Sequence, residues 1–137
     1  MARILVVDDE RDVADVLKAG LELRGHKVDA YYDPFVALSN FKPGVYDLVL
    51  SDIKMPKMNG FEMVYEIKKQ DKDIPVIFLT GYVDLLKEVN KLFTKLNVRE
   101  VIQKPIGIQE LAEKISGLGL GIKARSEGTN YRSDKGV

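Results

Sequence analysis

Cysteine is absent from this 137-residue chain, and histidine occurs once. Without cysteine the chain has no thiol nucleophile, no cysteine-ligated zinc site and no disulfide framework. No apolar run is long enough to cross a bilayer, and the start of the chain lacks the apolar stretch of a secretory signal, so we expect a cytoplasmic protein. Excess charge is missing too. Because 21 Lys and Arg balance 21 Asp and Glu, no overall field favours nucleic acid or an anionic membrane.

Four short apolar runs are the main feature that is present. They are separated by amphipathic segments of helix length, which predicts buried strands of a parallel sheet in one domain. Each run stops at a charged or hydroxyl residue. The runs are Ile4–Val7 before Asp8 and Asp9, Leu48–Leu50 before Asp52, Val76–Leu79 before Thr80, and Val101–Ile102 before Lys104. Because parallel strands end at the same edge of a sheet, we expect these polar side chains to converge there.

Strands and helices are expected to alternate along the chain. The other expected elements are a strand at Lys27–Tyr32, a strand at Asn97–Gln103, and helices ending near Gly25, over Val36–Phe41, from Phe61 to Lys68, near Val83–Thr94 and over Ile108–Ser116. One stripe of the first helix holds Val13, Val16, Leu17, Gly20, Leu21 and Arg24. This (βα)5 pattern predicts a doubly wound α/β fold of flavodoxin type, with five parallel strands in the order 2-1-3-4-5.

The end of the chain has a different composition. Residues 118–137 are first rich in glycine and then polar, so they are expected to form a tail or linker rather than a second core. The folded domain is therefore expected to span residues 1–117.

Three carboxylates at the predicted edge, Asp8, Asp9 and Asp52, need a compensating charge. Two carboxylates 4 Å apart repel by about 4 kcal/mol at an effective dielectric constant near 20. Mg²⁺ suits such an all-oxygen site, keeps waters on its other positions and accepts phosphoryl oxygens, and Mn²⁺ is expected to substitute for it. The set therefore indicates phosphoryl transfer to a carboxylate, with Lys104 and Thr80 contacting the phosphoryl oxygens.

At these residues the chain resembles the receiver domain of two-component response regulators. The resemblance covers about residues 2–116, and its motifs are Asp8-Asp9-Glu10, the run from Asp52 to Gly60, Thr80-Gly81 and Lys104-Pro105. It implies that Asp52 is the phosphoacceptor and, with Asp9, a direct metal ligand. It also implies that Asp8 acts through a metal-bound water and that the backbone carbonyl of Lys54 completes the protein's share of the metal shell.

The resemblance also implies the remaining roles. Thr80, followed by Gly81, is the switch hydroxyl, Lys104 binds the phosphoryl group, and the Lys104–Pro105 bond is cis. The implied partners are a sensor histidine kinase or phosphotransfer protein and a downstream target on the face of the fourth helix, fifth strand and fifth helix. The chain is expected to be a monomer or a phosphorylation-dependent dimer. It is not expected to be a turnover enzyme, to bind nucleic acid or to enter a membrane.

Three alternatives to a stand-alone phosphorylated receiver stay open at this point. The chain could be the receiver fragment of a larger DNA-binding regulator. It could be an interaction module that works without phosphorylation, which Val101 favours, because receivers often have Tyr or Phe three residues before the lysine and valine has no ring to turn inward. An aspartate phosphatase of the haloacid dehalogenase type is disfavoured, because it needs an Asp-x-Asp motif after the first strand.

The positions that tune dephosphorylation in receivers lie two residues after the phosphoacceptor and two after the hydroxyl. They hold Lys54 and Tyr82, which are both bulky, so Tyr82 is expected to hinder an attacking water. We therefore predict a phosphoryl group that decays slowly, which intact mass measured over time checks. Hydrolysis as fast as that of a free acyl phosphate contradicts this prediction.

Overall fold

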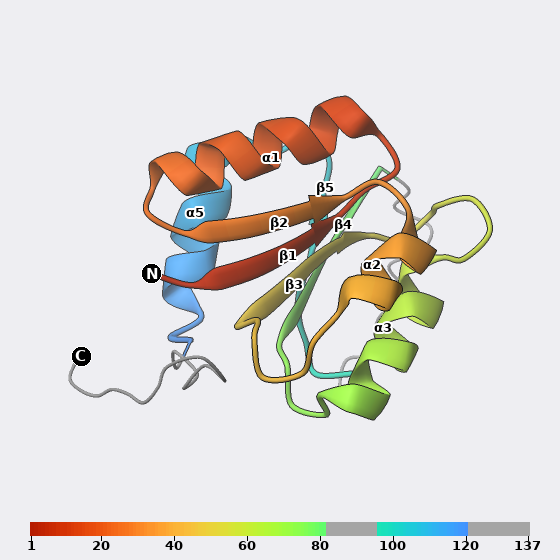
Figure 1. Cartoon of the computed structure of the whole chain (residues 1–137). Helices are drawn as coiled ribbons and strands as arrows, with labels where there is room; N and C mark the ends of the chain where they lie inside the picture. Colours follow the sequence, from red (N-terminus) through yellow and green to blue (C-terminus); the bar gives the residue numbers. More distant parts are fainter. Residues whose placement is uncertain (82–95, 121–137) are drawn as a thin grey trace.

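A parallel sheet forms the centre of the structure, which is a computed structural model that describes residues 1–81 and 96–120 (Figure 1). Within those residues the strands are β1 (Arg3–Val7), β2 (Lys27–Tyr31), β3 (Leu48–Asp52), β4 (Val76–Thr80) and β5 (Val98–Gln103). They pair in parallel in the order β2-β1-β3-β4-β5. The predicted fold class and strand order are therefore confirmed. The helix expected near Val83–Thr94, Tyr82 and the part of the expected tail from residue 121 onward lie outside the described residues.

Local sequence signals set the ends of the helices, which are α1 (Arg11–Leu23), α2 (Pro34–Asn40), α3 (Gly60–Gln70) and α5 (Ile108–Gly117). Asp33 caps α2 by accepting hydrogen bonds from the backbone amides two and three residues further on, and Pro34 fills the first helical position. Asn59 and Glu62 form a reciprocal capping box at the start of α3. Gly25 ends the first helix with a φ of +92°, a conformation that glycine adopts without strain.

Helices cover both faces of the sheet: α1 and α5 lie on one face, and α2 and α3 lie on the other (Figure 1). The strands supply residues to both cores, which explains why their apolar runs are continuous rather than alternating. The core under α2 and α3 includes Leu5, Val7, Val49, Phe78, Met63, Val64 and Ile67, and the core under α1 and α5 includes Ile4, Val6, Leu50, Ile77, Leu17, Leu21 and Leu111. None of the described helices has the length and apolar content that a bilayer crossing needs.

One residue of the apolar stripe expected in α1 faces away from the core. Ala14, Leu17 and Leu21 are the buried residues of this helix, whereas Val16 is 59% exposed. At 100° per residue, Val16 points well over 100° away from the direction that these three share. Ala14, rather than Val16, is the residue that packs in the core under this helix.

A close approach of two backbone segments connects α3 to the end of β3. The N–H of Gly60 donates to the carbonyl oxygen of Ile53 at 2.7 Å. A Cβ atom at Gly60 would lie 2.2 Å from the carbonyl oxygen of Asp52, which is backbone and cannot rotate away. Glycine at this position therefore allows α3 to begin directly beside the last residue of β3.

We predict that Gly60→Ala lowers the free energy of unfolding by about 1–3 kcal/mol, because the added methyl group must push the backbone after Asp52 aside. Urea unfolding followed by circular dichroism measures this. Gly117→Ala is the matched control, since a Cβ there meets nothing within 4 Å. Equal stability of the two variants would show that the approach at Gly60 is looser than the structure has it.

Candidate phosphoryl and metal site

Polar residues from four strands meet at the carboxyl-terminal edge of the sheet. Asp8 follows β1, Asp52 ends β3, Thr80 ends β4 and Lys104 follows β5. The backbone N–H of Lys104 donates to the carbonyl oxygen of Thr80 at 2.8 Å, so pairing between β4 and β5 continues as far as the lysine. These residues, which are widely separated in the chain, therefore share one edge of the fold.

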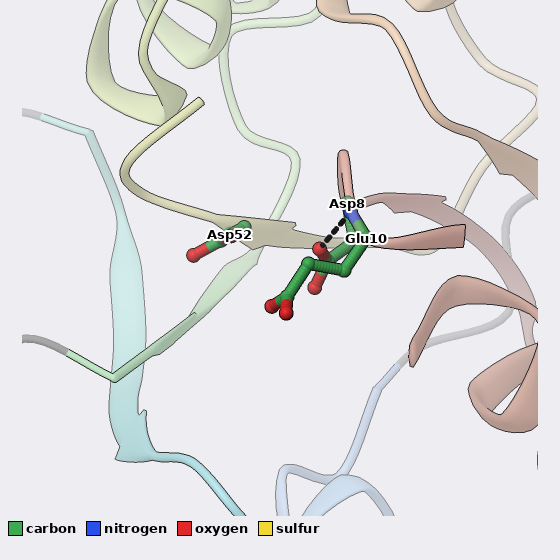
Figure 2. Close-up of side chains that lie close together, drawn as sticks. All are labelled: Asp8, Glu10 and Asp52. Carbon is green, nitrogen blue, oxygen red and sulfur yellow. Dashed lines mark hydrogen bonds between the residues drawn. The ribbon is translucent and has the colours of Figure 1, made fainter. Parts of the chain in front are cut away.

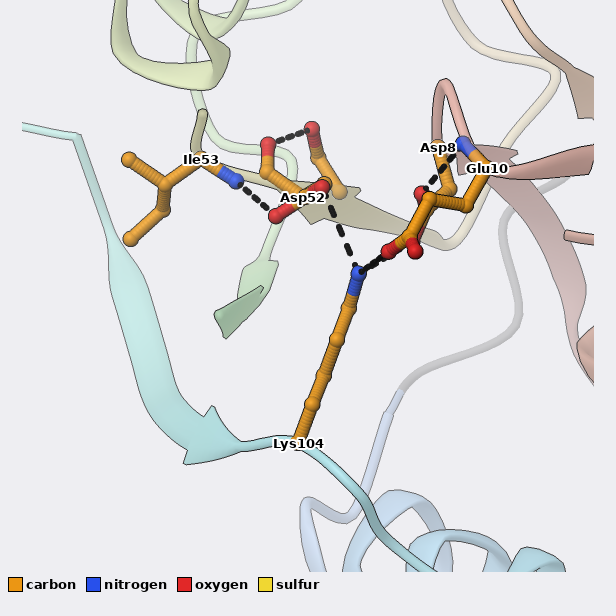
Figure 3. A network of polar contacts seen from close by, with 6 residues as sticks. Asp8, Glu10, Asp52, Ile53 and Lys104 are labelled. Carbon is orange, nitrogen blue, oxygen red and sulfur yellow. Dashed lines mark hydrogen bonds and ion pairs between the residues drawn. The ribbon is translucent and has the colours of Figure 1, made fainter. Parts of the chain in front are cut away.

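Backbone hydrogen bonds orient the carboxylates of Asp8 and Asp52. The N–H of Glu10 donates to Asp8 Oδ1 at 2.9 Å, and the N–H of Ile53 donates to Asp52 Oδ1 at 2.8 Å (Figure 3). Both aspartates are buried, with 1% and 6% of their surface exposed. In each case the second oxygen, Oδ2, faces the ammonium group of Lys104.

The Lys104 ammonium is shared among three carboxylates (Figure 3). Its Nζ lies 2.8 Å from Asp8 Oδ2, 3.2 Å from Glu10 Oε1 and 3.3 Å from Asp52 Oδ2. The short contact with Asp8 is an ion pair without good hydrogen-bond direction, so this buried oxygen accepts no well-directed hydrogen bond from the described residues. The Lys104 ammonium is the cation beside this oxygen in the structure, and a metal ion or a metal-bound water could take its place.

Glu10 also belongs to the site, although no role was predicted for it from the sequence. One oxygen each from Asp8, Glu10 and Asp52 lies within 4.8 Å of the others, a grouping that could hold a metal ion (Figure 2). The only sequence signal for Glu10 was its place in the acidic run after the first strand. Asp9 is partly buried and is not among the three grouped carboxylates, so its role as a direct ligand stays a prediction.

Burial and mutual repulsion disturb the titration of this site. Burial first, and then the charge of Asp8, raise the pKa of Asp52 to about 6, although Lys104 and the backbone N–H of Ile53 oppose the rise. Burial also raises the pKa of Asp8 above its ordinary value, against the effect of Lys104. Burial alone would lower the pKa of Lys104, but the two aspartates outweigh it and raise that pKa. The lysine stays charged, yet one ammonium does not fully compensate the carboxylates.

Thr80, Gly81 and Lys54 complete the loops at this edge. Thr80 is fully buried, and Gly81, which follows it, is exposed. Lys54 follows β3 and exposes its side chain. Thr80, the predicted switch residue, is therefore buried at this edge of the sheet. Lys54, which is predicted to tune dephosphorylation, lies at the surface.

Val101 and Pro105 lie on the segment that leads to and from Lys104. Val101 is partly buried against the core under α2 and α3 and pairs with Phe78 of β4. The Lys104–Pro105 peptide bond is cis. Tyr82, the other predicted tuning residue, lies outside the described residues.

Comparison with known proteins identifies the family. The family model of the response regulator receiver domain matches residues 4–116. The chain belongs to this receiver domain family. It is therefore a component of two-component signalling, and its acidic edge suits a divalent cation.

Curated relatives of this receiver domain are longer than the chain. The transcriptional regulatory protein DltR of Streptococcus agalactiae is 35% identical over 113 residues, which cover 82% of this chain and 50% of DltR. The response regulator SaeR of Staphylococcus aureus is 33% identical over 118 residues, covering 86% and 50%. The chain thus spans about half the length of the curated relatives it matches.

Solved receiver structures match nearly over their whole length. The response regulator TrrA of Thermotoga maritima, solved in complex with Mg²⁺ and BeF, is 36% identical with a TM-score of 0.72, covering 86% of this chain and 99% of TrrA. The non-phosphorylated HemR receiver domain of Leptospira biflexa is 26% identical with a TM-score of 0.77, covering 96% and 100%.

We predict that Asp52→Asn stabilises the metal-free domain near pH 7.5. The pKa of Asp52 is about 6 in the folded state, above the ordinary 3.8, so the native state binds the proton more tightly than the unfolded state does. Its charged form therefore costs the wild type stability above pH 6, by about 3 kcal/mol at most, and this cost disappears as the pH falls from 6 to 4.

Urea unfolding in EDTA at several pH values tests this. The Asp52→Asn variant should exceed the wild type by about 1–3 kcal/mol at pH 7.5, and the difference should shrink toward pH 4. Asp12→Asn removes the same charge from an exposed position of α1 and should show no such gain. A pH-independent difference would contradict the raised pKa.

Proposed function

We propose that this receiver domain is a Mg²⁺-dependent phosphoacceptor that takes a phosphoryl group onto Asp52. The observation that carries the proposal is the buried Asp52 carboxylate at the end of β3, whose Oδ2 lies 3.3 Å from Lys104 Nζ. The resemblance assigns the same residue to the phosphoacceptor role. The donor is the phosphohistidine of a sensor histidine kinase or of a phosphotransfer protein.

The acidic residues of the edge fit the metal that this reaction needs. By the family pattern Asp52, Asp9 and the backbone carbonyl of Lys54 hold the ion, and Asp8 acts through a water. The fit is supported by Asp8 Oδ2, a buried oxygen that accepts no directed hydrogen bond from the described residues, and by oxygens of Asp8, Glu10 and Asp52 that lie within 4.8 Å of one another. A bound Mg²⁺, or Mn²⁺ in its place, neutralises carboxylate charge and polarises phosphoryl oxygens.

A bound divalent cation and the Lys104 ammonium would compete for the charge of the same carboxylates. In the structure Lys104 Nζ is within ion-pair distance of both Asp8 Oδ2 and Asp52 Oδ2. A doubly and a singly charged cation 4 Å apart repel by about 8 kcal/mol at an effective dielectric constant near 20. A divalent cation held by Asp52, and by Asp8 through a water, would therefore displace the Lys104 ammonium from these carboxylates.

The transfer step exchanges one bond to phosphorus for another. An oxygen of the ionised Asp52 attacks phosphorus, the P–N bond of the phosphohistidine breaks, and the imidazole nitrogen keeps the electron pair. Lys104 pairs with one phosphoryl oxygen, and the Thr80 hydroxyl, by resemblance, donates to another. The product is an aspartyl phosphate on the chain itself, so the domain is not a turnover enzyme on an external substrate.

Phosphorylation has to change the affinity of the domain for a downstream protein. Such a change requires two conformations that the partner distinguishes. The target is expected on the face of β5, α5 and the expected helix at 83–94. We place this switch in the cytoplasm, as a monomer or as a dimer that forms on phosphorylation, without nucleic-acid or membrane contacts of its own.

A second candidate follows from the length comparison. DltR is named a transcriptional regulatory protein, and this chain spans about half of it. In this case the receiver is the control domain of a larger DNA-binding regulator, and the output is the DNA affinity of a second domain.

We predict that the wild type gains one phosphoryl group when it is incubated with Mg²⁺ and a small acyl-phosphate donor. Intact mass spectrometry measures the adduct, which should disappear with EDTA and in the Asp52→Asn variant. Asp12→Asn, which removes an exposed charge outside the acidic group, should be phosphorylated like the wild type. A folded wild type that binds Mg²⁺ yet gains no adduct would instead favour the phosphorylation-independent interaction module.

A further inference from the structure

Glu10 contacts the functional lysine, although the family roles given above do not include it. It is the N-cap residue of α1, but its side chain makes no capping hydrogen bond. Its carboxylate instead accepts a hydrogen bond from Lys104 Nζ at 3.2 Å (Figure 3). A residue at the start of α1 therefore contacts the residue that follows β5.

The three carboxylates around Lys104 differ in their freedom to move. Asp8 and Asp52 are buried, and a backbone amide holds Oδ1 of each. The side chain of Glu10 is 64% exposed, and among residues 1–81 and 96–120 it accepts a hydrogen bond from Lys104. Since exposed ion pairs stabilise a fold only slightly, this pair can rearrange at little cost. Of the three partners, Glu10 is thus the one that can follow the ammonium group when it moves.

We propose that Glu10 is a positioning residue for Lys104, which it would retain beside the site when a bound divalent cation displaces the ammonium group from Asp8 and Asp52. This inference rests on the proposed function, because it concerns the metal-bound form of the phosphoacceptor. The side chain of Lys104 is 15% exposed, so little water reaches its ammonium group. Without Glu10, an ammonium group displaced from Asp8 and Asp52 would therefore have no charged partner close by. Glu10 supplies that partner and keeps the ammonium near Asp52, where a phosphoryl oxygen would meet it.

The proposal gives Glu10 an effect on metal affinity that acts through Lys104. Removing the Glu10 charge leaves Lys104 bound more firmly to Asp8 and Asp52, so the competing divalent cation binds more weakly. A direct metal contact is the competing explanation, because a Glu10 oxygen lies within 4.8 Å of oxygens of the two aspartates. The two explanations differ in one respect: only the first requires the lysine.

A double-mutant cycle on the full chain separates them. Isothermal titration calorimetry with MgCl₂ gives the Kd of the wild type, Glu10→Gln, Lys104→Met and the double variant, and thermal unfolding without metal verifies that each is folded. We expect Glu10→Gln to weaken Mg²⁺ binding about five- to tenfold when Lys104 is present, and less than about twofold in the Lys104→Met background. Asp12→Asn is the matched charge control and should change the Kd less than about twofold in either background.

Two results for Glu10→Gln would overturn the inference. If Glu10→Gln weakens Mg²⁺ binding equally with Lys104 present and in the Lys104→Met background, Glu10 is a metal ligand rather than a partner of the lysine. If Glu10→Gln leaves the Kd unchanged with Lys104 present, Glu10 has neither role. These failures are distinguishable from failure of the proposed function. A wild type that binds Mg²⁺ and becomes phosphorylated on Asp52, while Glu10→Gln binds Mg²⁺ equally well, overturns the inference alone. A wild type that binds no Mg²⁺ overturns both.

Discussion

The ion pairs of Lys104 with Asp8 and Asp52 are the interaction on which the site depends. Two carboxylates that are almost fully buried lie at the ends of β1 and β3, where a sheet core would otherwise end in apolar or uncharged residues. Without the ammonium group their charges would repel one another in a poorly solvated place. The lysine follows β5, the last strand in the described sequence, so the site is complete only once β5 has joined the sheet through β4.

Burial of the two carboxylates lowers the stability of the metal-free fold. Burial raises the pKa of Asp52 to about 6, which means that folding works against the charge that a phosphoacceptor needs. The backbone amide of Ile53 and the Lys104 ammonium offset part of this cost, but they do not restore the ordinary pKa. A ligand that binds only the folded site adds to stability by mass action, so a divalent cation would stabilise the fold and ionise Asp52 together.

Much of the fold could be predicted from the sequence because its signals are local. Apolar runs with polar ends predict parallel strands, and an aspartate followed by proline, as at Asp33-Pro34, is typical of the helix start that α2 has. The site was harder to predict because it depends on distances between segments. Glu10 enters it through a long side chain that reaches Lys104, which no spacing rule predicts. Val16 was misplaced because an apolar residue next to a buried stripe can point either way until the helix is packed.

The backbone around Lys104 indicates how an event at Asp52 could reach the rest of the domain. The N–H of Lys104 donates a hydrogen bond to the carbonyl oxygen of Thr80, which couples movement of the lysine to movement of the hydroxyl residue. Within the described residues β5 is an edge strand, paired on one side with β4 alone, and it is therefore easier to displace than a central strand. Val101, on that strand, has no ring to reorient and is stiff at χ1. A change of partners at Lys104 would thus act through movement of the β4–β5 pair and the loops that follow it, rather than through the rotation of one aromatic side chain.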